Sequence, residues 1–542
     1  MGGRPVSLMG LCFWVCMFGY GVVSADSQSS PGEGTVQVNV SVGERAIAEI
    51  DEDFVCATLD WWPPEKCDYG VCSWHRASLL NLDLSNKILL NAVKAFSPLK
   101  IRLGGTLQDK VLYSTPDTKQ PCTSFVKDNS TMFGFTQGCL PMARWDQLNA
   151  FFEESGAKII FGLDALNGRT IPPQGPAVGA WDSTNAESFI RYTVSKNYTI
   201  FGWELGNELS GRGVGTRVTA SQYASDTISL KNLVLDIYKD VEPKPLILAP
   251  GGFVDSVWYK EFLDKTPKSL DVITHHIYNL GSGADQHLVE KILNPTVLDG
   301  ELATFRNLQS IIKSSASATS AVAWVGEAGG AYNSGRDHVS NTFLYSFWYL
   351  DQMGMASTFD TKTYCRQAFI GGNYGLLDAT SFIPNPDYYS ALLWHRLMGR
   401  NVLGASLSGS DKIRTYAHCA KASKGVMLIF INLDGNSTAE VTIVNNGTRM
   451  RSRRHYTFGK KVIQFPQDFT DENVREEYHL TPKDGDLVSQ TMLLNGNILA
   501  VSSSGEIPAF KPKYVNSSSS IVVAPHSIVF AHMPYYAIPD CS

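Results

Sequence analysis

The sequence lacks the features that mark several common classes of protein. Its 542 residues contain 46 Lys and Arg against 52 Asp and Glu, and this net charge of −6 gives no reason to expect a nucleic-acid partner. The GxSxG motif of serine hydrolases is missing. Gly104-Gly105-Thr106 is not followed by the GxGxxG pattern of dinucleotide-binding proteins. No apolar run after the first 25 residues is long enough to span a membrane.

The N-terminal segment, residues 1–25, has the pattern of a secretory signal peptide. Arg4 precedes an apolar core from Leu8 to Val23, and Val23-Ser24-Ala25 supplies small residues for cleavage before Asp26. A segment that stays attached as a membrane anchor is the alternative. We expect a protein that is secreted to the extracellular matrix or delivered to a lysosome or vacuole, with peripheral association to a membrane or matrix as a further option.

Glycosylation signals and cysteines agree with that route. Six N-x-S/T sequons occur, at Asn39, Asn129, Asn197, Asn436, Asn446 and Asn516. Eight of the ten cysteines follow the signal segment, where an oxidising compartment favours disulfides. We predict a bond between Cys419 and Cys541 and a second between Cys122 and Cys139, although spacing alone does not determine pairing. Cys56 lies in an apolar strand pattern, and we expect it to be a buried thiol.

Residues 50–400 alternate short apolar runs with amphipathic stretches. Strands are predicted at Phe54–Asp60, Lys100–Gly104, Lys158–Asp164, Ile200–Glu208, Leu246–Gly251, Asp271–Tyr278, Ala321–Glu327 and Ala356–Thr361. Helices are predicted at Arg144–Ser155, Thr219–Val241, Ser256–Leu263, Ser340–Met353 and Tyr388–Leu397. Apolar strands with helical connections predict a parallel sheet covered on its faces. Eight such units favour an α/β fold of the (β/α)8 TIM-barrel type over a doubly wound sheet.

The chain after residue 400 has a different pattern. Short β-branched runs separated by Asn, Gly and Ser turns predict a β-sandwich over residues 401–542. Its strands are expected at Val426–Leu433, Ala439–Val444, Tyr456–Phe465, Met492–Leu499, Ser519–Val523 and Ser527–His532. Residues 26–49 contain an alternating run, Thr35–Val42, which we expect to join this second domain.

Two glutamates stand at the ends of predicted barrel strands. Asn207-Glu208 ends the fourth strand, and Glu327 ends the seventh. Active sites of such barrels lie at the carboxyl ends of the strands, so these side chains are expected to face one another across the mouth. We further expect the fourth strand to finish in a bulge that turns both of its terminal side chains into one pocket.

Two opposed carboxyls suit the cleavage of a glycosidic bond. Glu208 would donate a proton to the leaving oxygen and Glu327 would attack the anomeric carbon. Asn207 would hold the sugar 2-hydroxyl, and a separation of about 5–5.5 Å would give retention of configuration. A zinc site is disfavoured because adjacent His275 and His276 point to opposite sides of a strand. No metal or cofactor is therefore expected.

Four motifs resemble the heparanase family of glycoside hydrolases, within the large clan of retaining barrel glycosidases. They are WELGNE around Asn207, ITHHIY at Ile273–Tyr278, VGEAGGAY around Glu327, and QAFIGGNYGLLD at Gln367–Asp378. The chain is most similar to the plant heparanase-like, or β-glucuronidase, branch. The resemblance implies a (β/α)8 barrel with a β-sandwich completed by an N-terminal strand. It also implies a retaining hydrolase of β-glucuronosyl linkages, endo or exo, acting on a glucuronate-containing polysaccharide, proteoglycan or glycoside.

The resemblance also implies roles for individual residues. Glu208 corresponds to the family proton donor and Glu327 to its nucleophile. The implied contacts to the sugar are Asp60, Thr106, Asn207, Tyr278, Gln367, Gly372 and Tyr374. Among these, Gly372 and Tyr374 correspond to the backbone amides and the phenol that bind the glucuronate carboxylate, a sensible use of exposed N–H donors toward an anion.

Two features separate this chain from a heparan sulfate-cleaving enzyme. Met132–Asp146 is almost uncharged, and no cleavable linker is evident. A basic cluster does occur, but in the predicted sandwich, at Arg449, Arg451, Arg453, Arg454, His455, Lys460 and Lys461, where it would suit a polyanion or a membrane surface or simply be a solvated loop. The competing hypotheses are a barrel glycosidase for a neutral β-glycan, a carbohydrate-binding glycoprotein without catalysis, and a membrane-tethered structural glycoprotein.

Overall fold

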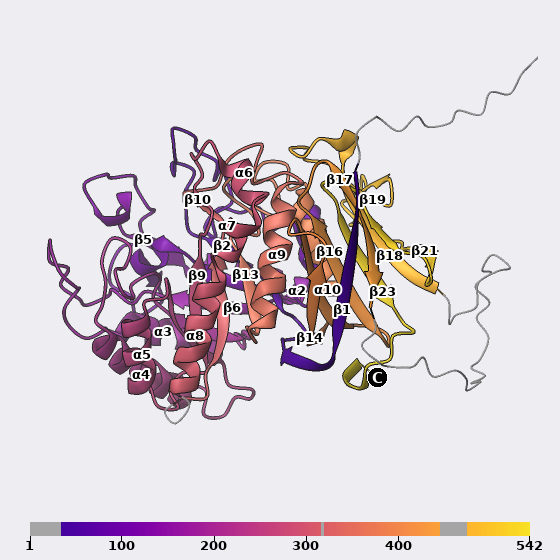
Figure 1. Cartoon of the computed structure of the whole chain (residues 1–542). Helices are drawn as coiled ribbons and strands as arrows, with labels where there is room; N and C mark the ends of the chain where they lie inside the picture. Colours follow the sequence, from indigo (N-terminus) through magenta and orange to yellow (C-terminus); the bar gives the residue numbers. More distant parts are fainter. Residues whose placement is uncertain (1–33, 316–318, 445–473, 542) are drawn as a thin grey trace, which may run out of the picture.

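The computed structural model describes residues 34–315, 319–444 and 474–541, which form a barrel and a large sheet side by side (Figure 1). Eight parallel strands close the barrel in the order β11-β13-β2-β3-β6-β7-β8-β9. Their bounds are β2 (Val55–Asp60), β3 (Lys100–Gly104), β6 (Lys158–Leu163), β7 (Gly202–Leu205), β8 (Leu246–Gly252), β9 (Val272–Ile277), β11 (Val322–Ala328) and β13 (Thr363–Arg366). The predicted (β/α)8 barrel is confirmed.

One barrel strand was assigned to the wrong segment. The predicted strand Ala356–Thr361 begins inside helix α9 (Tyr345–Thr358), and the eighth strand is β13, Thr363–Arg366. Helix α9 is buried around nearly its whole circumference because it lies between the barrel and the large sheet (Figure 1). A helix buried on all sides loses the amphipathic period that distinguishes helix from buried strand.

Helices cover the outside of the barrel. The longer ones are α1 (Lys87–Lys94), α2 (Met142–Ser155), α3 (Thr184–Ser195), α4 (Ala220–Ile237), α5 (Ser256–Lys265), α8 (Leu302–Ser314), α9 and α10 (Pro386–Leu397), with short α6 (Leu288–Ile292) and α7 (Pro295–Asp299). Side-chain caps at Asn86, Thr219 and Asp255 accept hydrogen bonds from the first amides of α1, α4 and α5. None of the helices in the described part of the chain combines the length and apolarity needed to cross a bilayer.

The second part is one mixed sheet of eleven strands. It contains β1 (Gly34–Glu49), β14 (Met398–Ser408), β15 (Ile413–Ala420), β16 (Val426–Asn432), β17 (Ser437–Ile443), β18 (Val474–Pro482), β19 (Met492–Leu494), β20 (Asn497–Ile498), β21 (Lys513–Asn516), β22 (Ile521–Val523) and β23 (Ile528–Met533). Indigo β1 lies among the orange and yellow C-terminal strands, antiparallel to β14 and parallel to β17 (Figure 1). The expected participation of the N-terminal strand is confirmed.

A β-sandwich was predicted for this part of the chain, and the single sheet forms both of its layers. Its β22 end folds back against β16 and β23, and Val40, Phe430 and Val523 pack in the core between the layers. The predicted strand Tyr456–Phe465, the signal segment, the basic cluster and Asn446 lie outside the described residues. The other five sequon asparagines are exposed.

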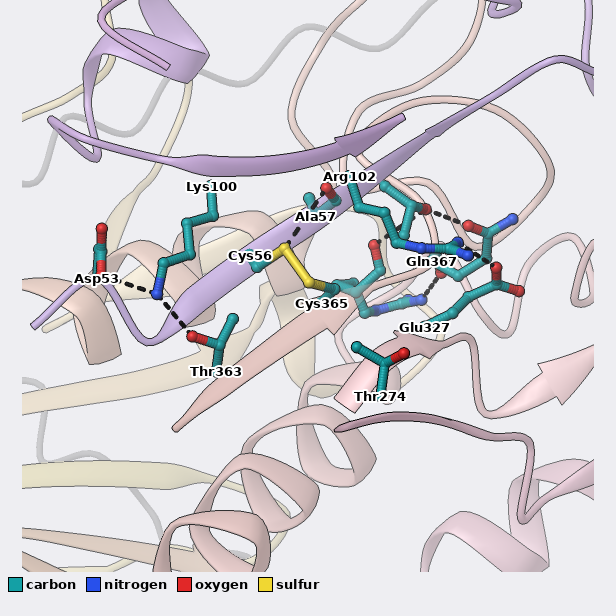
Figure 2. The surroundings of a disulfide bond; sticks show 12 residues. Asp53, Cys56, Ala57, Lys100, Arg102, Thr274, Glu327, Thr363, Cys365 and Gln367 are labelled. Atoms are coloured by element: carbon teal, nitrogen blue, oxygen red, sulfur yellow. Dashed lines mark hydrogen bonds and ion pairs between the residues drawn. A yellow bond between two sulfur atoms is a disulfide. The ribbon is translucent and has the colours of Figure 1, made fainter. Parts of the chain in front are cut away.

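The disulfides correct one prediction about cysteine. Cys122–Cys139 and Cys419–Cys541 are bonded, as is Cys67–Cys72. Cys56, however, is not a free thiol, because it is bonded to Cys365 (Figure 2). The two residues are direct neighbours in the register of β2 and β13, and both sulfurs lie in the barrel interior with residues of four other strands. This disulfide therefore joins the first and last strands of the barrel.

Candidate active site

The segment that carries Glu208 is a turn, not the bulge that was expected. Strand β7 ends at Leu205, and Gly206 (φ +69°) and Glu208 (φ +54°) are both left-handed. A side chain at Gly206 would lie 2.3 Å from the Tyr223 hydroxyl, so only glycine fits there. The backbone amide of Glu208 donates to the Gly251 carbonyl at 2.6 Å, which ties the turn to the neighbouring strand β8.

Glu208 and Glu327 converge at the barrel mouth on a shared histidine. Glu208 Oε1 lies 2.9 Å from His276 Nδ1, and Glu327 Oε2 lies 4.0 Å from the same nitrogen. One oxygen of each carboxyl and a ring nitrogen of His276 lie within 4.8 Å of one another. Glu208 is 8% and Glu327 5% exposed, so both face a sheltered site.

Hydrogen-bond donors surround Glu327. Arg102 Nη1 donates to its Oε2 at 2.9 Å, and the Tyr278 hydroxyl donates to its Oε1 at 2.6 Å. Figure 2 shows the Arg102–Glu327 contact beyond the Cys56–Cys365 disulfide. Arg102 also pairs with buried Glu204 and donates to Asn207 Oδ1 at 2.9 Å. Donors on both oxygens stabilise a negative charge on Glu327.

The two glutamates have different electrostatic surroundings. Burial raises the pKa of Glu208 to about 7, and the more distant Arg102 charge only partly opposes this effect. Burial also lowers the pKa of His276 to about 4, so the imidazole is neutral near pH 7. A neutral ring offers Glu208 a hydrogen bond without the positive charge that would favour its ionised form. The two carboxyls therefore differ: burial raises the pKa of Glu208, whereas Glu327 accepts hydrogen bonds on both of its oxygens.

Three candidate sugar-binding residues form a polar chain between the end of β2 and the segment that follows β13. Gln367 Nε2 donates to Asp60 Oδ2 at 3.0 Å and lies 3.4 Å from the Tyr374 hydroxyl. Burial, reinforced by the Glu327 charge, raises the pKa of Asp60 to about 7. Tyr374 and Tyr278 both pack against Gly329, where a Cβ would lie 3.3 and 2.6 Å from their rings.

The structure brings most of the predicted site residues together. Asn207 and Tyr278 belong to the hydrogen-bond network around Glu327. Asp60, Gln367 and Tyr374 form a second, separate chain, which meets the first where Tyr374 and Tyr278 both pack against Gly329. Half-buried Gly372 (φ +65°) lies against the Tyr374 ring. Half-buried Thr106 opens the turn after β3, but no contact links its side chain to the network.

Sequence reasoning missed three side chains that contact the candidate site. Arg102 is a fully buried arginine inside strand β3, His276 is the inward member of the His275-His276 pair, and Asp109 lies just after β3. A charged or titratable residue inside an apolar strand is the signal that could have singled out Arg102 and His276. The opposite orientation of His275 was expected, and its ring packs outside the site on Phe305.

Glu208, His276 and Glu327 are also the described group best placed to hold a cation. Two carboxylates and an imidazole are suitable ligands for zinc. Their ligand atoms are spread over as much as 4.8 Å, against roughly 4.2 Å between opposite ligands on one zinc ion, so the side chains would have to move closer together to hold one.

Comparison with known proteins places this geometry in context. Residues 34–354 match the model of Glycosyl hydrolase family 79, N-terminal domain. Heparanase-like protein 3 of Arabidopsis thaliana is 58% identical over 99% of both chains, and Baicalin-beta-D-glucuronidase of Scutellaria baicalensis is 45% identical over 93% of both. A solved 4-O-alpha-L-rhamnosyl-beta-D-glucuronidase from Fusarium oxysporum 12S shares the fold, with a TM-score of 0.62 at 16% identity over 92% of this chain and 100% of that one.

Proposed function

The chain belongs to glycosyl hydrolase family 79, and we propose that it hydrolyses β-glucuronosyl linkages with retention of configuration. Glu208 is the proton donor in this proposal and Glu327 is the nucleophile. The observation that carries it is the approach of one oxygen of each carboxyl to within 4.8 Å. Retaining glycosidases hold their carboxyls about 5–5.5 Å apart, whereas inverting enzymes leave roughly 6.5–9.5 Å for a water molecule.

The surroundings of the two carboxyls support these roles. Burial keeps Glu208 protonated up to a pH of about 7, as an acid that must donate to the leaving oxygen requires. Arg102 and Tyr278 each donate a hydrogen bond to Glu327, and these bonds orient its carboxyl for attack on the anomeric carbon. When the glycosyl–enzyme forms, the Glu327 charge is consumed, and Glu208, now ionised, accepts a proton from the incoming water. Hydrolysis of the intermediate restores both groups.

Asn207 contributes a contact to the sugar in the same site. Its amide oxygen accepts from Arg102, which orients the side chain and leaves the amide nitrogen to donate. We assign that nitrogen to the sugar 2-hydroxyl, a contact that strengthens as the ring flattens in the transition state.

Recognition of glucuronate is proposed for the β13 side of the mouth. The Tyr374 hydroxyl and the backbone around Gly372 are the donors assigned to the substrate carboxylate, and Gln367 and Asp60 extend the polar chain toward the sugar hydroxyls. The name of the Scutellaria relative, a baicalin β-D-glucuronidase, supports a glucuronide substrate. Four disulfides within the described residues also support a secreted or lysosomal–vacuolar location, because such bonds form in oxidising compartments.

A set of three proteins and two substrates tests the proposal. Wild type, Glu208→Gln and Glu327→Gln would be assayed on 4-nitrophenyl β-D-glucuronide and the matching β-D-glucoside, with product anomers followed by NMR. We expect turnover of the glucuronide by wild type only, with the β-anomer formed first. Azide should rescue Glu208→Gln as a β-glucuronyl azide, because a small anion replaces the base-activated water. Turnover that survives in Glu327→Gln would remove the nucleophile assignment, and a preference for the glucoside would remove the substrate class.

A further inference from the structure

An exposed phenylalanine stands beside the two glutamates. Phe253 directly follows β8 and is 44% exposed. Its ring centroid lies 6.3 Å from the ring of His276 and 6.3 Å from that of Tyr278, the side chains that bond Glu208 and Glu327 respectively. Single exposed apolar residues are common on protein surfaces. Phe253 differs because one side of its ring packs on the catalytic network while much of the side chain is open.

The backbone at Phe253 runs along the acid-bearing turn. A Cβ on the preceding residue, Gly252, would lie 3.3 Å from the Glu208 Cα atom. The Ser210 hydroxyl donates to the Phe253 carbonyl at 3.4 Å, which joins the two segments again. Phe253 therefore lies on the side of the site from which Glu208 delivers its proton, and this is the side of the leaving group.

The order of the barrel strands also places Phe253 on the leaving-group side of the site. The residues assigned to the glucuronate, Asp60 and Gln367, belong to β2 and the end of β13. In the closed ring, β2 lies opposite β8, and β13 lies opposite β7. A sugar held by Asp60 and Gln367 thus directs its glycosidic oxygen toward Glu208 and Phe253.

A second apolar residue borders the same place. Val214 is 37% exposed, and its backbone amide donates to the Glu208 carbonyl at 2.8 Å. This backbone bond places Val214 beside Glu208, and neither Val214 nor Phe253 has a side chain that offers a hydrogen bond. Such a border favours a leaving group with an apolar face.

We propose that Phe253 is a binding platform for the group released from the glucuronide, and that it selects leaving groups with a flat apolar face. This inference rests on the proposed function and names part of its substrate. The shared chemistry is a planar apolar surface stacked on the phenyl ring, supplied by an aromatic aglycone or by the apolar face of a sugar ring. Burial of the open part of the phenyl ring would add affinity that is realised only when such a group is present.

The test compares leaving groups in four proteins: wild type, Phe253→Ala, Phe253→Tyr and Val257→Ala. Val257, 80% exposed on α5, is the surface control. The substrates are β-glucuronyl fluoride, which has no ring to stack, 4-methylumbelliferyl β-D-glucuronide, and a glucuronosyl-β-linked neutral disaccharide. We expect Phe253→Ala to lower kcat/KM for at least one of the two substrates with a ring in the leaving group, the umbelliferyl glucuronide and the disaccharide. That loss should be about tenfold larger than the loss for the fluoride. Phe253→Tyr keeps the ring and should lie within about threefold of wild type on all three.

Each result decides the proposal. A selective loss on the aryl substrate identifies an aromatic aglycone, and one on the disaccharide identifies a sugar. Equal losses on all three substrates, or none, overturn the platform. Should wild type cleave no glucuronide, the proposed function fails, and binding of the umbelliferyl glucuronide to Glu327→Gln by calorimetry still tests the platform. Binding that is unchanged when Phe253→Ala is added would overturn it.

Discussion

The Asp109 carboxylate and the backbone amide of Asn207 are joined by a 2.8 Å hydrogen bond across 98 residues of sequence. The other Asp109 oxygen accepts from the Ala165 amide at 2.8 Å. A buried side chain from the loop after β3 thus holds the loops after β6 and β7. Glu208, the proposed acid, follows Asn207 directly, so Asp109 holds the backbone next to Glu208 without touching its side chain.

Replacing this acceptor should damage catalysis. In Asp109→Asn one of the two backbone amides would face an NH2 group, which cannot accept, and the turn carrying Glu208 would shift. We expect kcat to fall about 10- to 100-fold while KM changes less, because small displacements of a catalytic group are costly. Asp117→Asn, at an exposed position, is the matched control and should keep wild-type rates. Melting curves recorded alongside would separate a local shift from unfolding, and an undiminished kcat would contradict the role.

Loss of the phenol on the nucleophile should slow the reaction. Tyr278→Phe removes the donor that lies 2.6 Å from Glu327 Oε1. A charge-assisted hydrogen bond contributes about 1.5–3 kcal/mol, so we expect kcat/KM to drop roughly 10- to 150-fold. Tyr374→Phe serves as the comparison because its hydroxyl bonds Gln367 and not a glutamate. That variant should mainly raise KM for the glucuronide, and identical kinetics in both variants would argue against distinct roles.

The rate should fall as the solution becomes alkaline. The pKa of Glu208 is raised to about 7 by burial, so the acid form needed for proton donation is lost above that value. Asp60, whose pKa is also about 7, ionises over the same pH range and adds to this alkaline decrease in rate. A profile of kcat/KM from pH 4 to 9 should therefore decline through about pH 7. A plateau that extends to pH 9 would be incompatible with this assignment.

The same shift makes a prediction for stability. Between the ordinary pKa of 4.5 and about 7, folded Glu208 binds more protons than unfolded Glu208, so its contribution to the free energy of unfolding decreases as pH rises. The Gln side chain in Glu208→Gln cannot ionise, so this variant does not lose stability in this way as the pH rises. Its melting temperature relative to wild type should increase from pH 5 to pH 8, by an amount equivalent to at most about 3 kcal/mol. If the difference in melting temperature between Glu208→Gln and wild type does not vary with pH, burial does not raise the pKa of Glu208.

The disulfide inside the barrel should matter more than the one at the rim. Cys56–Cys365 closes a sequence separation of 309 residues and Cys67–Cys72 one of 5. Loop-closure entropy alone gives about 6 kcal/mol for the first and about 2 kcal/mol for the second. Urea unfolding of the two paired Cys→Ala variants would measure this difference. Equal losses of unfolding free energy would contradict the expectation that loop-closure entropy sets the contributions of these two disulfides.

Metal should inhibit this site and not activate it. Glu208, His276 and Glu327 present ligand atoms of the kind that zinc prefers. A zinc ion there would remove both catalytic groups from the reaction. We expect dialysis against a chelator to leave the rate unchanged and millimolar zinc to lower it reversibly. Loss of activity on chelation, restored by a divalent cation, would contradict a reaction carried by the carboxyls alone.

Much of the barrel follows from local pattern. The apolar run Leu246–Gly251 predicts a strand, and the structure has one there that extends to Gly252, because strands covered on both faces are rich in apolar side chains. The rule fails at Ala356–Thr361, since helix α9 is enclosed by the barrel and the sheet and its apolar residues no longer repeat with a helical period. Whether distant parts of the chain bury an element cannot be read from the sequence of that element alone.

The sequence by itself determined the fold class, the family, and the presence of Glu208 and Glu327 at the ends of two strands. Only the tertiary structure decided which side chains act on them. Arg102, His276 and Asp109 reach the glutamates through bonds that span 225, 68 and, by way of Asn207, 98 residues of chain. Closure of the barrel makes these neighbours, as it does Cys56 and Cys365. Local propensity acts over a few residues, whereas the protonation and orientation of an acid depend on whatever the closed ring places against it.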